Sequence, residues 1–359
     1  MEAAGTCQGL GGAYDGNAQP RNMFVRGTEG NSVMWVRAHG MALMIGSGLM
    51  ITACTLTYST LDGTSDAPMD FAGRVDIGDG RTMYIECIGK GSPTVVLVSG
   101  QRGSAADWHI TASRTTPAQP AVVGEVARFT RVCAYDRPGT PVGEKFSRSD
   151  PSSQPTTAAA ATSDLHALLQ AAGERSPFVM VGHSAGGMIV RLFASTYPRE
   201  VMGMVLVDAL AEGLQDAETV EQWVTQRILL RGDIDASLIE YPELERFDAD
   251  RSFDQLRAAS ALRPMPLVVL SADEPIGPVV AAMVPGSAWL AGVPVDFGYV
   301  IDAAQRSSQA KLAALVPGAR HVTDTHSGHN IHHEQPRLVV ETIRDVVTAV
   351  REGRTSVDQ

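Results

Sequence analysis

The chain has 359 residues and a net charge of −11, with 44% hydrophobic and 19% charged residues. This composition excludes a disordered scaffold, and the negative charge disfavours a nucleic-acid partner. The four cysteines, at positions 7, 54, 87 and 133, are too scattered for a zinc cluster. We therefore expect a globular protein of one large domain with an appended part, or of two domains.

The first 53 residues do not follow a folded-domain pattern. Residues 1–33 are rich in Gly, Asn and Gln, so we expect them to be disordered or to precede the true start at Met34. Residues 34–53 have a basic start, an apolar run and small residues before Cys54, which is the layout of a secretory signal. The segment Ile51-Thr-Ala-Cys54 resembles the lipobox of bacterial lipoproteins, which implies lipidation of Cys54.

An uncleaved signal anchor and an ordinary signal peptide are the alternatives for this segment. Both predict the same location, because arginines precede the apolar run and aspartates follow it. We expect an exported protein of the cell envelope, held at the membrane by a lipidated Cys54. Residues 54–70 are then a linker and residues 353–359 a tail.

From residue 71 onward, apolar strand-like runs alternate with helical patterns, as in α/β proteins. We expect strands over residues 73–77, 82–88, 94–99, 131–135, 178–181, 204–207, 266–270 and 319–323. Helices are expected over residues 163–172, 188–197 and 336–351, with a loop over residues 147–157. Two insertions, residues 209–263 and 275–317, interrupt the alternation. Their helical pattern predicts a cap or surface decoration.

A candidate nucleophile lies in Gly182-His-Ser184-Ala-Gly186, which follows an apolar strand and precedes a helix. Such a sharp strand-to-helix turn exposes the serine hydroxyl, and the two glycines avoid collisions at the turn. The helix start also favours negative charge developing at this site. The alternative is a glycine-rich turn that only packs a helix on a sheet.

A serine nucleophile needs a base, and four histidines lie between residues 326 and 333. We expect His329 to be that base, because a strand, a loop and a proline-started helix place it at the same sheet edge as Ser184. His326, His332 and His333 are rivals, and a metal site is disfavoured because no carboxylate or cysteine pattern completes it.

The third member of a triad orients the histidine. Asp208 and Asp273 both follow apolar strands, and either satisfies the chain order Ser, Asp, His. We favour Asp273, because it lies on the loop beside the one that carries His329. Asp208 is then a structural turn residue, and Glu274 is a weaker rival.

Residues 71–352 resemble an α/β-hydrolase fold enzyme of the esterase and lipase type. The segments that carry the resemblance are Val96-Leu-Val-Ser-Gly100-Gln101, Ala134-Tyr-Asp-Arg-Pro-Gly139, Gly182–Gly186, Val205-Leu-Val-Asp208-Ala and Ser327-Gly-His329.

The resemblance implies an eight-stranded, mostly parallel sheet with flanking helices and a helical cap, residues 209–263, after strand six. It also implies an oxyanion hole from the backbone amides of Ala185 and Gln101. Ser99-Gly100 replaces the usual His-Gly before Gln101. The usual strand order places Cys87 and Cys133 on adjacent strands, as a disulfide or as two buried thiols.

These features predict a serine hydrolase that cleaves carboxylic esters, with Ser184, His329 and Asp273 as triad and no metal or cofactor. The acidity of the chain favours a neutral, partly apolar ester as substrate. The alternatives are an aminopeptidase or amidase of the same fold, and a non-catalytic envelope binding protein. Relatives with an aspartate nucleophile, such as epoxide hydrolases, are disfavoured by Ser184.

Overall fold

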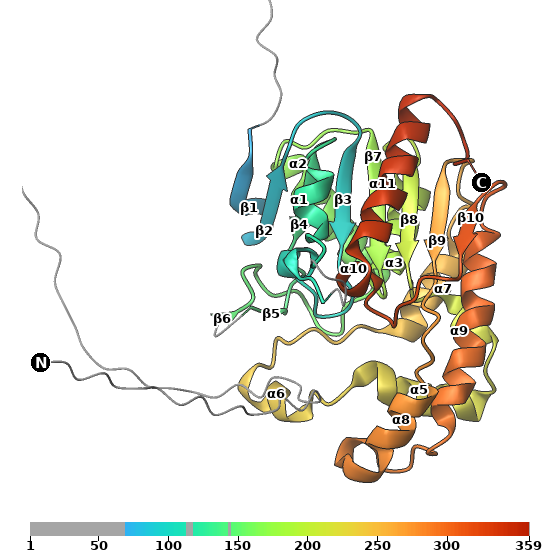
Figure 1. Cartoon of the computed structure of the whole chain (residues 1–359). Helices are drawn as coiled ribbons and strands as arrows, with labels where there is room; N and C mark the ends of the chain where they lie inside the picture. The colour runs from blue at the N-terminus through green and yellow to red at the C-terminus, as the bar shows by residue number, and fades with distance from the viewer. Residues whose placement is uncertain (1–68, 113–117, 143–144, 359) are drawn as a thin grey trace, which may run out of the picture. The chain divides into compact units, whose positions relative to one another are not determined.

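The apolar runs of the sequence pair into one sheet in the computed structural model, which describes residues 69–112, 118–142 and 145–358. The sheet has eight strands in the order β1-β2-β4-β3-β7-β8-β9-β10 (Figure 1). Their bounds are β1 Phe71–Gly78, β2 Arg81–Ile88, β3 Thr94–Val98, β4 Val132–Tyr135, β7 Phe178–His183, β8 Val201–Val207, β9 Leu267–Leu270 and β10 Arg320–Val322. The predicted eight-stranded, mostly parallel sheet is confirmed.

The direction of the strands divides the sheet into two parts. β1 pairs antiparallel with β2, and β2 pairs antiparallel with β4. The remaining neighbours are parallel: β4 with β3, β3 with β7, β7 with β8, β8 with β9 and β9 with β10. β3 and β7 are buried along their whole length, as expected for central parallel strands covered on both faces. β1 instead has exposed and half-buried residues in alternation, as an edge strand should.

Helices cover both faces of the sheet. On one face, α2 (Ala158–Ala171) and α3 (Gly186–Thr196) pack on alternate strand residues such as Val96 and Met180. On the other face, α1 (Val122–Val126) and α11 (Pro336–Arg351) pack on Val95 and Val179 (Figure 1). Since successive strand residues point to opposite faces, one apolar run supplies both cores.

The insertion after β8 is helical, as predicted for residues 209–263. It holds α4 (Glu212–Asp216), α5 (Val220–Arg231), α6 (Asp235–Glu240) and α7 (Ala249–Ala258), and we call it the cap. Trp223 of α5 packs against Phe253 of α7, with ring centroids 5.5 Å apart. The second insertion forms α8 (Gly277–Met283), two 3-10 turns and α9 (Phe297–Ala313). Figure 1 shows α5, α6 and α8 below the sheet.

Several short elements complete the fold. They are the 3-10 helix η1 (Ala105–His109), the hairpin of β5 (Pro141–Val142) and β6 (Lys145–Phe146), and α10 (Ile331–Glu334). None of them was predicted, because each is too short to carry a hydrophobic period.

Cys87 of β2 and Cys133 of β4 are register partners and form a disulfide. Their Cα atoms are 4.1 Å apart, and both residues are buried. Of the two alternatives left by the sequence, the structure thus contains the bridge. It ties the antiparallel β1–β2 edge to the parallel part of the sheet.

The predicted signal segment, residues 34–53, and Cys54 lie outside the described residues. Within the part of the chain that is described, no helix combines the length and the apolar character needed to cross a membrane.

Candidate active site

Ser184 occupies a strained turn between β7 and α3. Its φ is +51°, a left-handed value that serine rarely adopts. Backbone bonds hold it there: its N–H donates to Val207 O at 3.2 Å, and Leu210 N–H donates to its carbonyl at 2.9 Å. The side chain is half-buried at the C-terminal edge of the sheet. This is the geometry expected of an exposed nucleophile on a rigid support.

The two glycines that flank Ser184 permit this turn. A Cβ atom at Gly182 would lie 2.7 Å from Gly186 O, and one at Gly186 would lie 2.3 Å from Val98 O. Both distances are far below a normal contact. The expectation that both glycines are needed to avoid collisions at this turn is therefore confirmed.

His329 is paired with Asp208. Its Nδ1 lies 2.6 Å from Asp208 Oδ2, the short distance of a charge-assisted hydrogen bond. His329 lies between β10 and α10, and its side chain is 48% exposed, whereas that of Asp208 is 5% exposed. A buried carboxylate thus holds an imidazole whose other nitrogen remains available for chemistry.

The Asp208 carboxylate is oriented by the residues around it. Asp208 follows β8 with a φ of +39°. Its Oδ1 accepts from Ala272 N at 3.2 Å and from Gln305 Nε2 of α9 at 3.3 Å. These contacts occupy Oδ1 and leave Oδ2 for His329.

The preference for Asp273 as the partner of His329 was wrong. Asp273 accepts from the backbone amides of His326 at 3.1 Å and Ser327 at 2.9 Å, so its oxygens are used to shape the histidine loop. Although its own burial opposes ionisation, these backbone hydrogen bonds lower the pKa of Asp273. Asp208 and Asp273 follow the adjacent strands β8 and β9, so both lie near the histidine loop. The carboxylate of Asp208 points at the His329 ring, whereas that of Asp273 points at backbone amides.

The electrostatics at His329 suit a general base. Desolvation acts against its protonated form, but the hydrogen bond and the negative charge of Asp208 outweigh it. The pKa of His329 is therefore raised above its ordinary value of 6.5. An imidazole with a raised pKa is a stronger proton acceptor, and the carboxylate stabilises the imidazolium that forms.

The two segments expected to supply the oxyanion amides lie beside Ser184. Ala185 immediately precedes α3, where first-turn amides have no intrahelical acceptor. The loop after β3 passes close to the serine: a Cβ atom at Gly100 would lie 3.5 Å from Ser184 Oγ. Gln101 follows Gly100 directly, so its amide lies on the segment that borders the nucleophile.

Residues 95–342 match the model of the alpha/beta hydrolase family. The chain belongs to this family. An uncharacterized protein of Bacillus subtilis, YqjL, is 25% identical over 263 residues, which cover 72% of this chain and 85% of that protein. An uncharacterized protein of Schizosaccharomyces pombe is 30% identical over 144 residues, 35% of this chain and 26% of that protein.

Three of the solved structures to which the chain is similar are two esterases and an epoxide hydrolase. One is a thermophilic esterase from Thermogutta terrifontis, with 20% identity, a TM-score of 0.47 and coverage of 79% of this chain and 99% of that one. The other is carboxylesterase CesB from Bacillus subtilis, with 16% identity, a TM-score of 0.48 and coverage of 77% and 91%. An epoxide hydrolase, CorEH, has 16% identity, a TM-score of 0.46 and coverage of 79% and 100%.

The rival histidines of this alpha/beta hydrolase lie in other surroundings than His329. His326 is exposed, and His333 Nε2 donates to Asp107 O at 2.9 Å. His332 is buried, and its ring packs 4.6 Å from that of Trp108, measured between centroids. Trp108 is therefore a packing residue.

His183 is a supporting residue that the sequence did not reveal. It is the first of the two variable positions in the Ser184 pentapeptide, and its Nε2 donates to His329 O at 3.1 Å. Burial holds the pKa of His183 well below 6.5, so its ring stays neutral beside His329. The only sequence signal was its place next to Ser184, because its partner lies 146 residues further along the chain.

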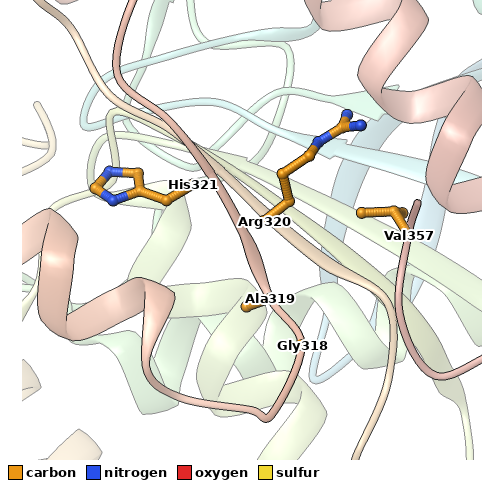
Figure 2. Close-up of a pocket in the computed structure, with 5 residues that line it drawn as sticks. All are labelled: Gly318, Ala319, Arg320, His321 and Val357. Carbon is orange, nitrogen blue, oxygen red and sulfur yellow. The ribbon is translucent and has the colours of Figure 1, made fainter. Parts of the chain in front are cut away.

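A cavity of about 280 Å³ lies elsewhere, between β10 and the C-terminal segment. It is lined by Gly318, Ala319, Arg320, His321 and Val357. In Figure 2 the side chains of Arg320 and His321 project to opposite sides of the strand. No member of the candidate triad lines this cavity, so it is not the catalytic site.

Proposed function

We propose that this alpha/beta hydrolase is a serine esterase that works through an acyl-enzyme intermediate. The observation that carries the proposal is the Asp208–His329 hydrogen bond of 2.6 Å at the sheet edge where the strained Ser184 is held. A buried carboxylate and the imidazole that it orients are the groups that activate a serine hydroxyl as a nucleophile.

The proposed chemistry has two halves. Ser184 Oγ attacks the ester carbonyl carbon while His329 Nε2 accepts the hydroxyl proton, and the amides of Ala185 and Gln101 stabilise the oxyanion. The bond to the alkoxy oxygen then breaks, and His329 returns the proton to the departing alcohol. Water attacks the acyl-enzyme by the same route, which releases the acid and restores Ser184.

The test is labelling with a fluorophosphonate, which reacts with activated serines, together with hydrolysis of a nitrophenyl ester. Ser184→Ala should remove the label and lower turnover by orders of magnitude without unfolding the chain. Ser271→Ala is a matched control, because Ser271 Oγ also lies 2.7 Å from a histidine nitrogen, His321 Nε2. It should keep label and activity, and an active Ser184→Ala enzyme would refute the proposal.

The same measurements separate the alternatives. A folded wild-type protein that takes no label would instead favour a non-catalytic binding protein. Comparison of a nitrophenyl ester with the matching anilide distinguishes an esterase from an amidase, because the catalytic groups are the same in both. A neutral ester is the proposed substrate, since the net charge of −11 repels anions.

We further propose that the protein is exported and anchored at the cell envelope by a lipid on Cys54. The Cys87–Cys133 disulfide supports export, because such bonds persist mainly in oxidising compartments. Mass spectrometry of the membrane fraction should find a lipidated Cys54 at the mature N-terminus. A Cys54→Ser variant should lose that mass. A native chain that retains Met1 unmodified would refute this proposal.

A further inference from the structure

The loop after β3 that carries Gln101 contains a residue in an unfavourable conformation. Arg102 has a φ of +57°, a left-handed value that costs energy for any residue with a side chain. Such a conformation persists only where the surroundings hold it. The amide of Gln101 shares a peptide unit with the Gly100 carbonyl, and that carbonyl accepts from Gly103 N at 3.0 Å. Arg102 lies inside this turn, so the placement of the Gln101 amide depends on what fixes Arg102.

The group that fixes Arg102 comes from the cap. Glu245 lies between α6 and α7, and its Oε2 accepts from Arg102 N at 2.6 Å. Glu245 is 1% exposed. A short hydrogen bond from a backbone N–H to a buried carboxylate is among the stronger hydrogen bonds in proteins.

Arg137, on the loop after β4, holds the same carboxylate from the other side. Its Nε donates to Glu245 Oε2 at 3.1 Å, and its Nη2 donates to Oε1. The backbone N–H of Arg137 also donates to Gly103 O at 3.3 Å. One buried ion pair thus contacts both Arg102 and Gly103, the two residues that follow Gln101.

The backbone of the cap is fixed at the same point. Glu245 N donates to Gly139 O at 3.0 Å. Gly139 has a φ of +72°, and a Cβ atom there would lie 2.4 Å from Glu243 O. Only glycine at position 139 allows the loop after β4 and the cap segment around Glu245 to approach this closely. The backbone of Glu245 is thus fixed, and this helps to hold its carboxylate in place.

We infer that Glu245 is a positioning residue for the oxyanion hole. The cap then has a role in catalysis: the Glu245 carboxylate sets the conformation at Arg102 and with it the placement of the Gln101 amide. This inference rests on the proposed function, since it assigns Gln101 to the oxyanion hole.

Two substitutions test it. Glu245→Gln offers one acceptor oxygen in place of two, so it cannot serve Arg102 N and both Arg137 donors. Glu245→Asp keeps a negative charge for Arg137. Because the aspartate side chain is one methylene shorter, its carboxylate no longer reaches Arg102 N. The second variant keeps the test valid if the first, which leaves Arg137 buried without a counter-charge, fails to fold.

Glu174→Gln is the matched control. Glu174 accepts from Arg131 Nε at 2.9 and 3.0 Å and from Nη2 at 2.7 Å, and both side chains are at most 3% exposed. Arg131 precedes β4, at the opposite sheet edge from Ser184. This variant breaks a buried ion pair of the same type without touching the loop after β3.

The readouts are kcat/KM for a nitrophenyl ester per fluorophosphonate-titrated site, and the affinity for an alkyl boronic acid, whose adduct with serine places an oxygen in the oxyanion hole. Both Glu245 variants should lose about tenfold or more in both quantities, because misplaced oxyanion donors weaken only the tetrahedral state. Glu174→Gln should leave both unchanged per site, even where its melting temperature falls.

Glu245 variants as active per site as the wild type would overturn the inference, as would equal losses in Glu174→Gln. Failure of the proposed function gives a different result. In that case the wild type takes no label, or Ser184→Ala stays active.

Discussion

At the scale of single residues, two aspartates of similar position have different tasks. Asp208 directs one carboxylate oxygen at the His329 ring. Asp273 instead accepts from backbone amides of the loop that carries His329. Asp208→Asn should lower kcat about 10³–10⁴-fold, because an amide cannot stabilise the imidazolium or select its tautomer.

Asp273→Asn is the comparison variant. It removes a loop acceptor and should reduce thermal stability, while kcat per titrated site stays within a few-fold of the wild type. Steady-state kinetics on titrated enzyme decide between the two. A larger loss of kcat in Asp273→Asn than in Asp208→Asn would instead identify Asp273 as the acid of the triad.

The pH dependence of activity follows from His329. In the proposed mechanism the neutral form of His329 accepts the proton of Ser184, and Asp208 raises the pKa of His329 above 6.5. Activity should therefore be low in acid, where His329 is protonated, and kcat/KM should rise to a plateau through a midpoint above pH 6.5. His183 stays neutral across this range, because burial lowers its pKa.

A profile of kcat/KM against pH measures this midpoint directly. Asp208→Asn should move the midpoint of its residual activity to lower pH, since the charge that raises the pKa is gone. A wild-type midpoint at or below 6.5 would contradict the assignment of His329 as the base.

At the scale of elements, the turn between β7 and α3 depends on close backbone packing. A methyl group at Gly186 would lie 2.3 Å from Val98 O, so α3 would have to move away from β3. Gly186→Ala should lower the free energy of unfolding by about 1–3 kcal/mol and displace the nucleophile. Urea denaturation and ester hydrolysis measure the two effects.

Gly124→Ala provides the control for this substitution. Gly124 lies in α1, and nothing lies within 4 Å of its added methyl group. Alanine is favoured over glycine within helices by up to about 1 kcal/mol, so this variant should be neutral or slightly more stable. Equal destabilisation by both substitutions would show that the contact with Val98 is not the cause.

The elements themselves were largely predictable from local patterns. All eight expected strands are present, because each is an apolar run bounded by turn residues, and the three expected helices are found near their predicted bounds. The order of the strands came from the resemblance to the α/β-hydrolase fold. Local patterns carry no information on which strand ends become neighbours.

The candidate site was predictable only in part, for a related reason. Ser184 and His329 follow from motifs that specify local geometry. The choice of Asp208 depends on its φ and on Gln305, which lies 97 residues further along the chain. Glu245 and Arg102 are 143 residues apart. Contacts of this kind leave no periodic or local signal in one sequence.

At the scale of the whole molecule, the antiparallel edge of the sheet is attached to the parallel part in two ways. β2 pairs with β4 through backbone hydrogen bonds, and the Cys87–Cys133 disulfide joins the same two strands. Both sulfur atoms lie in the apolar core beneath α2. The bridge therefore affects the stability of the domain and lies away from the Ser184 loop.

The effect of this disulfide on stability is measurable. It joins residues 46 positions apart, and closing a loop of this size restricts the unfolded chain. Replacing both cysteines by alanine should lower the free energy of unfolding by about 2–4 kcal/mol. Turnover per titrated site should not change, because the bridge lies in the apolar core, away from Ser184, His329 and the loop after β3.

Equilibrium urea unfolding with and without a phosphine reductant separates the bridge from the packing of its sulfur atoms. Reduced wild type retains both sulfur atoms but lacks the bond, so its midpoint should fall most of the way to that of the double alanine variant. If reduction leaves the wild-type midpoint unchanged while the variant is destabilised, core packing, and not the bond, stabilises this edge of the sheet.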